Sequence, residues 1–324
     1  MTAAERILVL GGTSFLGRAI VERALSDGHE VTLFNRGVTN PGLYPEAEHL
    51  KGDRSSDLSA LEGRAFDLVI DVACYDPADA ARSVSCLKDS TGRYVFVSTV
   101  SVYERHDTVE AQKEDAPVLP VRPDQDAGER YGANKAAAEE IVRDAFGDGA
   151  LIGRPGLIVG PYDKTDRFTY WPRRLAHGGR VLAPESPDYV VQFIDVRDLG
   201  SFLLRAGVGG LSGTFNLVGP PMSLGGLLES CRVPEVPAEL VYVPGSALLA
   251  AGVEQWMGLP LWIAEEGWEA ANTVDGSAAV AAGLSFRPLR ETVEGARSTD
   301  PGPGPHTLRI EREAELLKEL APES

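Results

Sequence analysis

The sequence predicts an α/β fold, a doubly wound parallel sheet with a smaller C-terminal lobe. Short apolar runs rich in Val, Ile and Leu alternate with helical patterns through the first half of the chain. This alternation is typical of parallel strands that are joined by helical crossovers. A glycine cluster directly follows the first apolar run. The chain has 324 residues, 43% of them hydrophobic, which is enough for a large two-lobed unit with a buried core.

Six strands and three helices are expected in the first half of the chain. The first strand contains the run Ile7 to Leu10, which glycines stop, as in a buried parallel strand. The first helix ends at Gly28, and Asp76 followed by Pro77 begins the second. We expect strands at residues 6–12, 29–37, 47–53, 66–73, 92–103 and 150–161, and helices at 14–28, 76–90 and 128–140.

Charge and cysteine content exclude several classes of protein. The formal net charge is −17, so the surface repels phosphate backbones and anionic lipid, and neither nucleic acid nor a membrane is expected as a partner. Cys74, Cys86 and Cys231 have no CxxC spacing and are expected to be reduced, packed thiols. The five histidines show no metal-ligand spacing, so we expect no metal site. The N-terminal apolar run is too short for a signal peptide, and the protein is expected to be cytoplasmic.

The turn "LGGTSFLGR" connects the first strand to the first helix. Its glycines, Gly11, Gly12 and Gly17, allow a tight turn and let a pyrophosphate approach the free N–H groups of the helix. The turn could instead be purely structural, but its place between strand and helix favours dinucleotide binding. Ser14 stands where a GxxGxxG spacing has its middle glycine. The expected cofactor contacts in this turn are Gly11, Thr13, Ser14, Phe15, Leu16 and Gly17.

The end of the second strand suggests which dinucleotide binds. NAD-binding folds usually place a carboxylate there for the ribose hydroxyls, whereas this sequence has Asn35 followed by Arg36. An arginine can pair with a 2′-phosphate, so NADP is the predicted cofactor and NAD is the second choice. Asp53 and Arg54 follow the third strand. Asp53 is placed to accept a hydrogen bond from the adenine amino group, or it is only a turn residue.

Tyr131 and Lys135 are four residues apart in a predicted helix, so they share one helical face. This spacing alone allows two interpretations. The pair could be exposed side chains on a solvated helix, or it could be a phenolic acid with a cation beside it.

Taken in order, the motifs resemble the extended short-chain dehydrogenase/reductase family, the NAD-dependent epimerase/dehydratase group. The resemblance runs from about residue 6 to residue 295. It is carried by "GGTSFLG", "GDRSSD", "VFVSTVSVY", "YGANK", "RPGLIVGP", "VQFIDVRDLG", "GTFNLVGP" and "DGSAAVAAGLSFRPLRETV".

The resemblance implies a Rossmann domain and a smaller, discontinuous substrate-binding lobe. We expect the Rossmann domain at residues 1–165, with residues 190–218 partly returning to it. The substrate-binding lobe is expected at residues 166–300, and a linker and helix at 301–324. A homodimer is also implied by resemblance.

In the family, the residue that matches Tyr131 is the acid/base for a substrate carbonyl or hydroxyl. Lys135 would bond the nicotinamide ribose and lower the phenol pKa from its usual value of about 10. Thr99 would hold the substrate oxygen, with Ser98 just before it. Ser101, expected on the same strand face as Thr99, is a second candidate to contact substrate.

Other family segments would surround the cofactor. Val72, Ala73 and Cys74 match the segment that follows the fourth strand, and Cys74 is expected to pack and not to act as a nucleophile. Asp71 and Tyr75 flank them. Arg154 begins the segment that passes the nicotinamide, which also includes Pro155, Gly156 and Ile158.

The substrate end is less well defined by the sequence. Arg167, Tyr170 and Trp171 are candidates to line it, with Phe168 beside them and Arg173, Arg174 and Arg180 nearby. The aromatics could equally be core residues and the arginines solvated. Nucleotide-sugar members of the family carry an arginine where this chain has Val191, which cannot pair with a diphosphate.

The leading hypothesis is therefore an NADPH-dependent reductase of a small-molecule carbonyl. One alternative is a nucleotide-sugar epimerase or dehydratase that uses NAD(P). A second alternative is a non-catalytic cofactor sensor or RNA-binding relative of the fold. Trp256, Trp262 and Trp268 suggest an amphipathic cap or interface. The tail is expected to form a helix with Leu316, Leu317 and Leu320 on one side. This helix either docks, on the body or on a partner, or is a frayed end.

Overall fold

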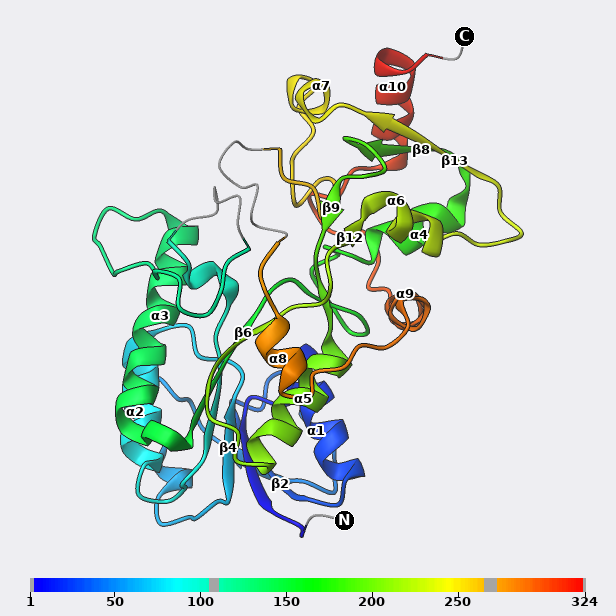
Figure 1. The fold of residues 1–324 in the computed structure, drawn as a ribbon. Helices are drawn as coiled ribbons and strands as arrows, with labels where there is room; N and C mark the ends of the chain where they lie inside the picture. Colours follow the sequence, from blue (N-terminus) through cyan, green and yellow to red (C-terminus); the bar gives the residue numbers. More distant parts are fainter. Residues whose placement is uncertain (1–2, 105–110, 265–272, 323–324) are drawn as a thin grey trace.

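The computed structural model describes residues 3–104, 111–264 and 273–322. The chain forms a large α/β lobe and a smaller lobe built mainly from the second half of the sequence (Figure 1). The large lobe contains a seven-stranded sheet with the order β11-β6-β5-β4-β1-β2-β3. Every pairing in that sheet is parallel. Its strands are β1 (Arg6–Leu10), β2 (Glu30–Asn35), β3 (Glu48–Lys51), β4 (Leu68–Asp71), β5 (Tyr94–Val97), β6 (Ala150–Pro155) and β11 (Gly213–Leu217).

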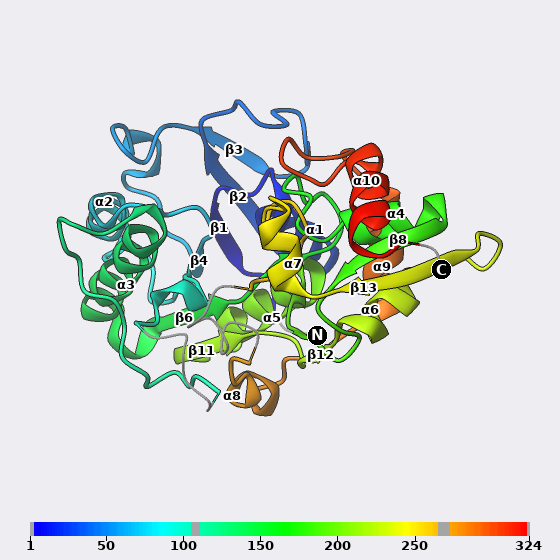
Figure 2. The same cartoon turned by 90° about the horizontal axis from the view of Figure 1, so that it is seen from above.

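Helices cover both faces of the sheet, as the doubly wound prediction requires. Helices α2 (Pro77–Leu87) and α3 (Ala127–Phe146) lie on one face, and α1 (Phe15–Ser26) and α5 (Val196–Val208) lie on the other (Figures 1 and 2). The central strands β4, β5 and β6 are buried along their whole length, as parallel strands covered on both faces are. The strand order reverses between β1 and β4, so their carboxyl ends open a crevice where ligands bind in such folds.

Local sequence signals explain where the helices begin. Asp76 accepts a hydrogen bond from the Ala78 N–H at 2.7 Å, and Pro77 occupies the first position of α2. Asp126 caps α3 in the same way through the Glu129 N–H. No helix in the described ranges is both long enough and apolar enough to cross a bilayer.

Two predicted strands are shorter than the sequence suggested. The strand expected at 92–103 ends at Val97, because the Thr99 hydroxyl accepts a hydrogen bond from the Ser101 N–H and starts a short 3₁₀ turn, η2 (Val100–Val102). The prediction that Thr99 and Ser101 share a strand face was therefore wrong. The strand expected at 150–161 also divides: β6 stops at Pro155, and β7 (Ile158–Val159) pairs with β10 (Ile194–Asp195).

The smaller lobe has its own core. Strand β8 (Gly179–Pro184) pairs with β13 (Ala238–Val243), and β9 (Val190–Val191) pairs with β12 (Met222–Ser223). The core contains Phe168, Trp171 and Trp262, all fully buried. Around it are the helices α4 (Tyr170–His177), α6 (Leu224–Ser230), α7 (Gly245–Ala250), α9 (Leu289–Ser298) and α10 (Ile310–Leu320), while α8 (Ser277–Ala281) lies near β11.

The C-terminal helix α10 docks on the body of the chain, which was one of the two predicted outcomes. Leu316 and Leu317 are buried in the core of the smaller lobe. Glu313, itself 1% exposed, pairs with Arg174 at 2.5 Å and accepts the Leu182 N–H at 2.8 Å. The helix is thus a structural part of this lobe.

Candidate active site

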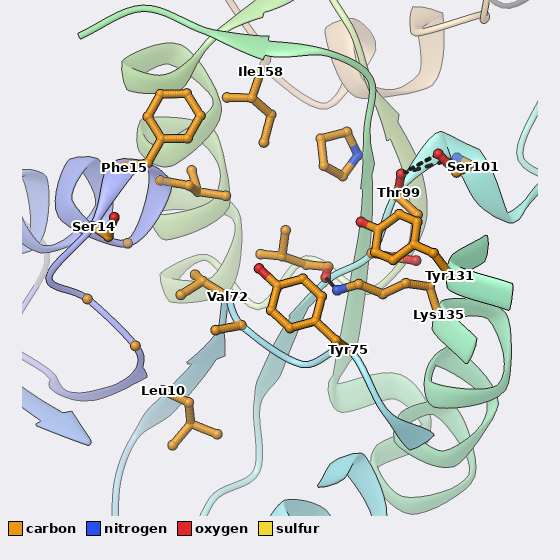
Figure 3. Close-up of a pocket in the computed structure, with 18 of the residues that line it drawn as sticks. Leu10, Ser14, Phe15, Val72, Tyr75, Thr99, Ser101, Tyr131, Lys135 and Ile158 are labelled. Atoms are coloured by element: carbon orange, nitrogen blue, oxygen red, sulfur yellow. Dashed lines mark hydrogen bonds between the residues drawn. The ribbon is translucent and has the colours of Figure 1, made fainter. Parts of the chain in front are cut away.

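A cleft of about 1090 Å³ opens at the carboxyl ends of the sheet strands. Its lining comes from the turn after β1, the ends of β2, β4, β5 and β6, helix α3, and segments of the smaller lobe near residues 167, 192 and 255–263. Figure 3 shows the part of the cleft that lies between the first turn and α3. A cavity of this size and position is typical of a small-molecule or cofactor site.

Backbone geometry builds one end of the cleft. Gly11 and Gly12 have φ values of +118° and +101°, which disfavour any residue with a Cβ. A Cβ on Gly17 would lie 2.6 Å from the Gly12 nitrogen, so only glycine lets α1 approach the turn. The Ser14 hydroxyl makes no capping bond within the described residues. Ser14, Phe15, Leu16 and Gly17, at the start of α1, line the cleft, and the uncapped N–H groups of a helix start can bind an anion.

The ends of β2 and β3 extend this region. Asn35 accepts a hydrogen bond from the Gly37 N–H at 2.8 Å, and its amide donates to the Gly11 carbonyl at 3.4 Å, which ties the strand end to the glycine turn. Arg36 is exposed and lines the cleft. Asp53 lines it too, and its pKa lies below the ordinary value because Ser55 donates hydrogen bonds to it.

Arg54 was predicted as a cofactor contact, but its guanidinium is already occupied. It donates to both oxygens of Asp71, at 2.8 and 2.6 Å, and to Ser83. Tyr94 also donates to Asp71, which is fully buried and does not face the cleft. Burial opposes ionisation of Asp71, yet Arg54 and Tyr94 hold the pKa of its carboxyl below the ordinary value.

Thr99, Tyr131 and Lys135 meet on one wall of the cleft. Figure 3 shows the Tyr131 ring beside Thr99, with Lys135 extending from the same helix. The Thr99 hydroxyl donates to Ser101 at 3.1 Å, and the Lys135 amine donates to the Val97 carbonyl at 2.7 Å. Helical spacing and the early end of β5 thus bring the three predicted groups together. Tyr131 remains 36% exposed, whereas Lys135 is 2% exposed.

The ionisation of this wall differs from the prediction. Burial raises the pKa of Tyr131 above its ordinary value, and a hydrogen bond from Thr99 only partly opposes this. The charge that opposes burial at Tyr131 is that of Arg167, while the Lys135 amine donates to the Val97 carbonyl. Burial lowers the pKa of Lys135 itself to about 8, against the opposing charge of Asp71.

A buried ionic network lies directly behind this wall. Ser98 lines the cleft, but its hydroxyl donates to Glu139 at 2.5 Å. Glu139 also accepts two hydrogen bonds from Arg154, at 2.9 and 2.7 Å. Arg154 was expected beside the nicotinamide. It is instead 3% exposed and lies outside the cleft lining. Sequence reasoning missed Glu139, although it follows Lys135 by one helical turn.

Most residues of the two segments predicted to surround the cofactor line the cleft, but Cys74 does not. Val72, Ala73, Pro155, Gly156 and Ile158 line the cleft. Cys74 does not: its side chain packs in the core between the sheet and α2, and burial raises its pKa to about 12. Successive side chains after β4 point to opposite sides, so the side chain of the next residue, Tyr75, points into the cleft (Figure 3). Its ring centre lies 6.4 Å from that of Tyr131.

Of the four residues predicted to contact substrate, Ser101 and Arg167 line the cleft, whereas Tyr170 and Trp171 do not. Tyr170 and Trp171 are buried in the core of the smaller lobe, where the Trp171 indole donates to the Pro260 carbonyl at 3.0 Å. Their assignment as substrate contacts was wrong, because both lie on the side of α4 that packs against this core. Arg167 does line the cleft.

Several lining residues of the smaller lobe were not predicted. Trp256 lines the cleft, whereas Trp262 is core, and Trp268 lies outside the described residues. Residues Leu157, Gln192, Val218, Gln255, Ile263 and Val274 complete this end. No spacing in the sequence distinguishes them from core residues. Within the ranges that the structure describes, no group of three or more His, Cys, Asp or Glu side chains could hold a metal ion.

Comparisons with known proteins agree with this architecture. The solved structure of the Bordetella bronchiseptica enzyme WbmH in complex with NAD+ matches with a TM-score of 0.65 at 18% identity, covering 92% of this chain and 98% of that one. Among curated proteins, the chain is 33% identical over 163 residues to 2'-dehydrokanamycin reductase of Streptomyces kanamyceticus, covering 47% of this chain and 43% of the relative.

A second curated relative is the chloroplast stem-loop binding protein of 41 kDa b of Arabidopsis thaliana. It is 27% identical over 217 residues, which cover 62% of this chain and 54% of the relative. The chain spans about half the length of the curated relatives it matches. The sequence model of the NAD dependent epimerase/dehydratase family matches residues 7–83 and 78–216. The chain therefore belongs to the NAD-dependent epimerase/dehydratase family.

Proposed function

We propose that this protein is an NADPH-dependent reductase of a small-molecule carbonyl. The observation that carries the proposal is the convergence of Thr99, Tyr131 and Lys135 on the wall of a cleft that begins at a glycine turn. The 2'-dehydrokanamycin reductase relative supports a reductive reaction. The WbmH structure supports a nicotinamide cofactor in this fold.

The residues present fit a dinucleotide. The positive φ values at Gly11 and Gly12 and the open start of α1 suit a pyrophosphate. Arg36 would pair with a 2′-phosphate, and the amide of Asn35 imposes no charge repulsion on it. Val72, Ala73, Pro155, Gly156 and Ile158 would enclose the nicotinamide end, with Lys135 on the ribose. When bound, NADPH supplies hydride, that is, a proton with two electrons, to a carbonyl carbon.

The chain's own residues would manage the carbonyl oxygen. Thr99 would donate a hydrogen bond to it and hold it against Tyr131. Tyr131 would then give its phenolic proton to the oxygen as negative charge develops there, and would regain a proton from solvent. The raised pKa of Tyr131 keeps the phenol protonated at neutral pH, as a proton donor in a reduction requires.

A carbonyl panel tests the proposal. Purified protein is mixed with NADPH or NADH and with aldehydes, ketones and oxo acids, and cofactor consumption is followed by absorbance. We expect NADPH consumption with at least one class of carbonyl and a slower reaction with NADH. Mass spectrometry of the protein as purified adds an independent readout, because it identifies any dinucleotide that is retained. No consumption across the panel would contradict the proposal.

Nucleotide-sugar chemistry is the enzymatic competitor. Val191 is buried in β9 and cannot bind a diphosphate. Stabilisation by a dTDP- or UDP-sugar in a thermal-shift assay would nevertheless favour this competitor over carbonyl reduction.

The Arabidopsis relative motivates a second candidate function, stem-loop binding. The net charge of −17 opposes it. Filter binding to an RNA stem-loop at two salt concentrations decides between them. Salt-sensitive binding in the micromolar range or tighter would favour the second candidate.

A further inference from the structure

Among the described residues, Arg167 at the substrate end of the cleft has no carboxylate partner. Four cationic side chains line the cleft in the described part of the chain: Arg36, Arg54, Lys135 and Arg167. Arg54 is neutralised by Asp71. Lys135 donates to the Val97 carbonyl, and Arg36 lies at the end of β2, beside the glycine turn. Arg167 alone among these four comes from the smaller lobe, where substrate is expected.

The geometry of Arg167 leaves most of its donors available. Its Nε donates to the Thr165 hydroxyl at 3.0 Å, and its guanidinium carbon lies 5.9 Å from the centre of the Trp256 ring. It forms no ion pair with any carboxylate in the described ranges. An arginine has five N–H donors in a planar fork that matches a carboxylate or phosphate.

Two arginines that follow Arg167 in the sequence, Arg173 and Arg174, form ion pairs with carboxylates. Arg173 pairs with Asp166 and Asp300, both at 2.5 Å. Arg174 pairs with Glu313. Arg173 and Arg174 thus have carboxylate partners, whereas Arg167 has none among the described residues and lines the cleft.

The end of the cleft formed with the smaller lobe is largely apolar. It is lined by Leu157, Val218, Trp256, Ile263 and Val274. The amide of Gln192 is occupied by the backbone, since it donates to the Gly219 and Val274 carbonyls and accepts the Val274 N–H. Gln255 accepts the Ala264 N–H through its side-chain oxygen. An apolar substrate body therefore suits this space better than a sugar does.

Arg167 also lies within electrostatic reach of the proposed proton donor. Its charge lowers the pKa of Tyr131, against the larger effect of burial. One ligand can therefore place a carbonyl at Thr99 and Tyr131 and a second polar group at Arg167.

We propose that Arg167 binds an anionic oxygen group of the substrate, a carboxylate or a phosphate, that is attached to an apolar body. This inference rests on the proposed carbonyl reduction and narrows its substrates to oxo acids and oxo-alkyl phosphates. The Thr165 hydroxyl, and the Trp256 ring nearby, hold the guanidinium while it receives the anion.

Matched substrates test the inference. The kcat/KM for NADPH consumption is measured with medium-chain 3-, 4- and 5-oxo acids, with their neutral methyl esters, and with an oxo-alkyl phosphate of similar length. We expect wild-type protein to favour the anions. In Arg167→Met, kcat/KM for the anions falls roughly 10- to 100-fold, the range for a lost hydrogen-bonded charge pair. The esters change less than about threefold, and Arg167→Lys restores part of the loss.

The control is Arg290→Met, because Arg290 is 85% exposed in an ion pair on α9. It should leave both substrate sets unchanged. The acid and phosphate arms show which anion is bound. An equal loss for acids and esters in Arg167→Met, or a wild-type preference for esters, overturns the inference while leaving carbonyl reduction intact.

A binding experiment distinguishes failure of the proposed reductase function from failure of the anion site. If wild-type protein reduces no carbonyl, binding of octanoate and of octyl phosphate is measured by calorimetry with the wild type and Arg167→Met. Binding that Arg167→Met abolishes supports the anion site without the reductase. No binding to the wild type overturns the site as well.

Discussion

The two ends of the cleft are built in different ways. The cofactor end is made by backbone, since Gly11, Gly12 and Gly17 set the turn that precedes α1. The substrate end is made by side chains such as Arg167 and Trp256, which come from separate segments of the smaller lobe. A backbone site depends on spacing along the chain, whereas a side-chain site depends on tertiary packing. The predictions below test this contrast, beginning with the wall where the two ends meet.

The largest effect is expected from Tyr131→Phe, which removes the proposed proton donor and keeps the ring. We expect kcat to fall about 10³-fold, within the usual range for general acid catalysis. The affinity for NADPH should change little. Both are measured by steady-state kinetics and fluorescence titration.

Tyr75→Phe is the matched control for that change. Its ring lies in the same cleft, 6.4 Å from Tyr131, and no catalytic role is assigned to its hydroxyl. Equal losses of activity in the two variants would remove Tyr131 from its proposed role.

Gly17→Ala tests the backbone-built end. The new Cβ would lie 2.6 and 2.8 Å from backbone atoms of Gly12, which cannot rotate away. We expect a loss of about 1–3 kcal/mol in the free energy of unfolding, as for other overpacked sites, and weaker dinucleotide binding. Urea denaturation measures the first effect. Gly42→Ala is the control, because a Cβ there meets nothing within 4 Å, and a loss as large in this variant would contradict the packing argument.

Lys135 adds a pH dependence at the boundary between the two ends. Its pKa is about 8 in the folded protein against 10.5 ordinarily, because burial disfavours the ammonium. Between these values the unfolded chain binds more protons than the folded one, so the free energy of unfolding rises with pH. From pH 8 to 10 we expect a gain of about 2 kcal/mol in wild type relative to Lys135→Met. Parallel denaturation curves for the two proteins across this window would show that Lys135 titrates normally.

Arg36→Ala should produce the smallest change and separates the two cofactors. We expect NADPH to bind roughly tenfold more weakly, because one charge-assisted contact to the 2′-phosphate is lost. NADH binding should not change, and Arg290→Ala should affect neither. An equal loss for NADPH and NADH would argue against 2′-phosphate recognition.

The sequence predicted six of the seven sheet strands, the helices α1, α2 and α3 and the position of the glycine turn, because apolar periodicity and glycine spacing are local signals. It did not predict β11 or α5. It placed Thr99, Tyr131 and Lys135 correctly relative to the cleft, through helical spacing and family order. It did not locate the end of β5, because a side-chain hydrogen bond from the Ser101 N–H to Thr99 overrides strand propensity there.

The substrate end was largely beyond sequence reasoning. Tyr170 and Trp171 resemble pocket residues in composition, yet they face the core of the smaller lobe. Trp256 and Gln192 line the cleft only because distant segments bring them there. Orientation also decided the roles of Cys74 and Tyr75, which are neighbours in sequence but point to opposite sides.

The network of Ser98, Glu139 and Arg154 has a consequence for how this protein can diverge. All three side chains are buried, and Glu139 accepts hydrogen bonds from the other two. Replacing one of them would therefore leave a buried charge or hydrogen-bonding group without its partner. A substitution at one of these three positions is therefore expected to need a second substitution that restores the pairing. Arg167 belongs to no such network in the described structure, so under the proposed function a single exchange there can change the substrate preference while Thr99, Tyr131 and Lys135 are kept.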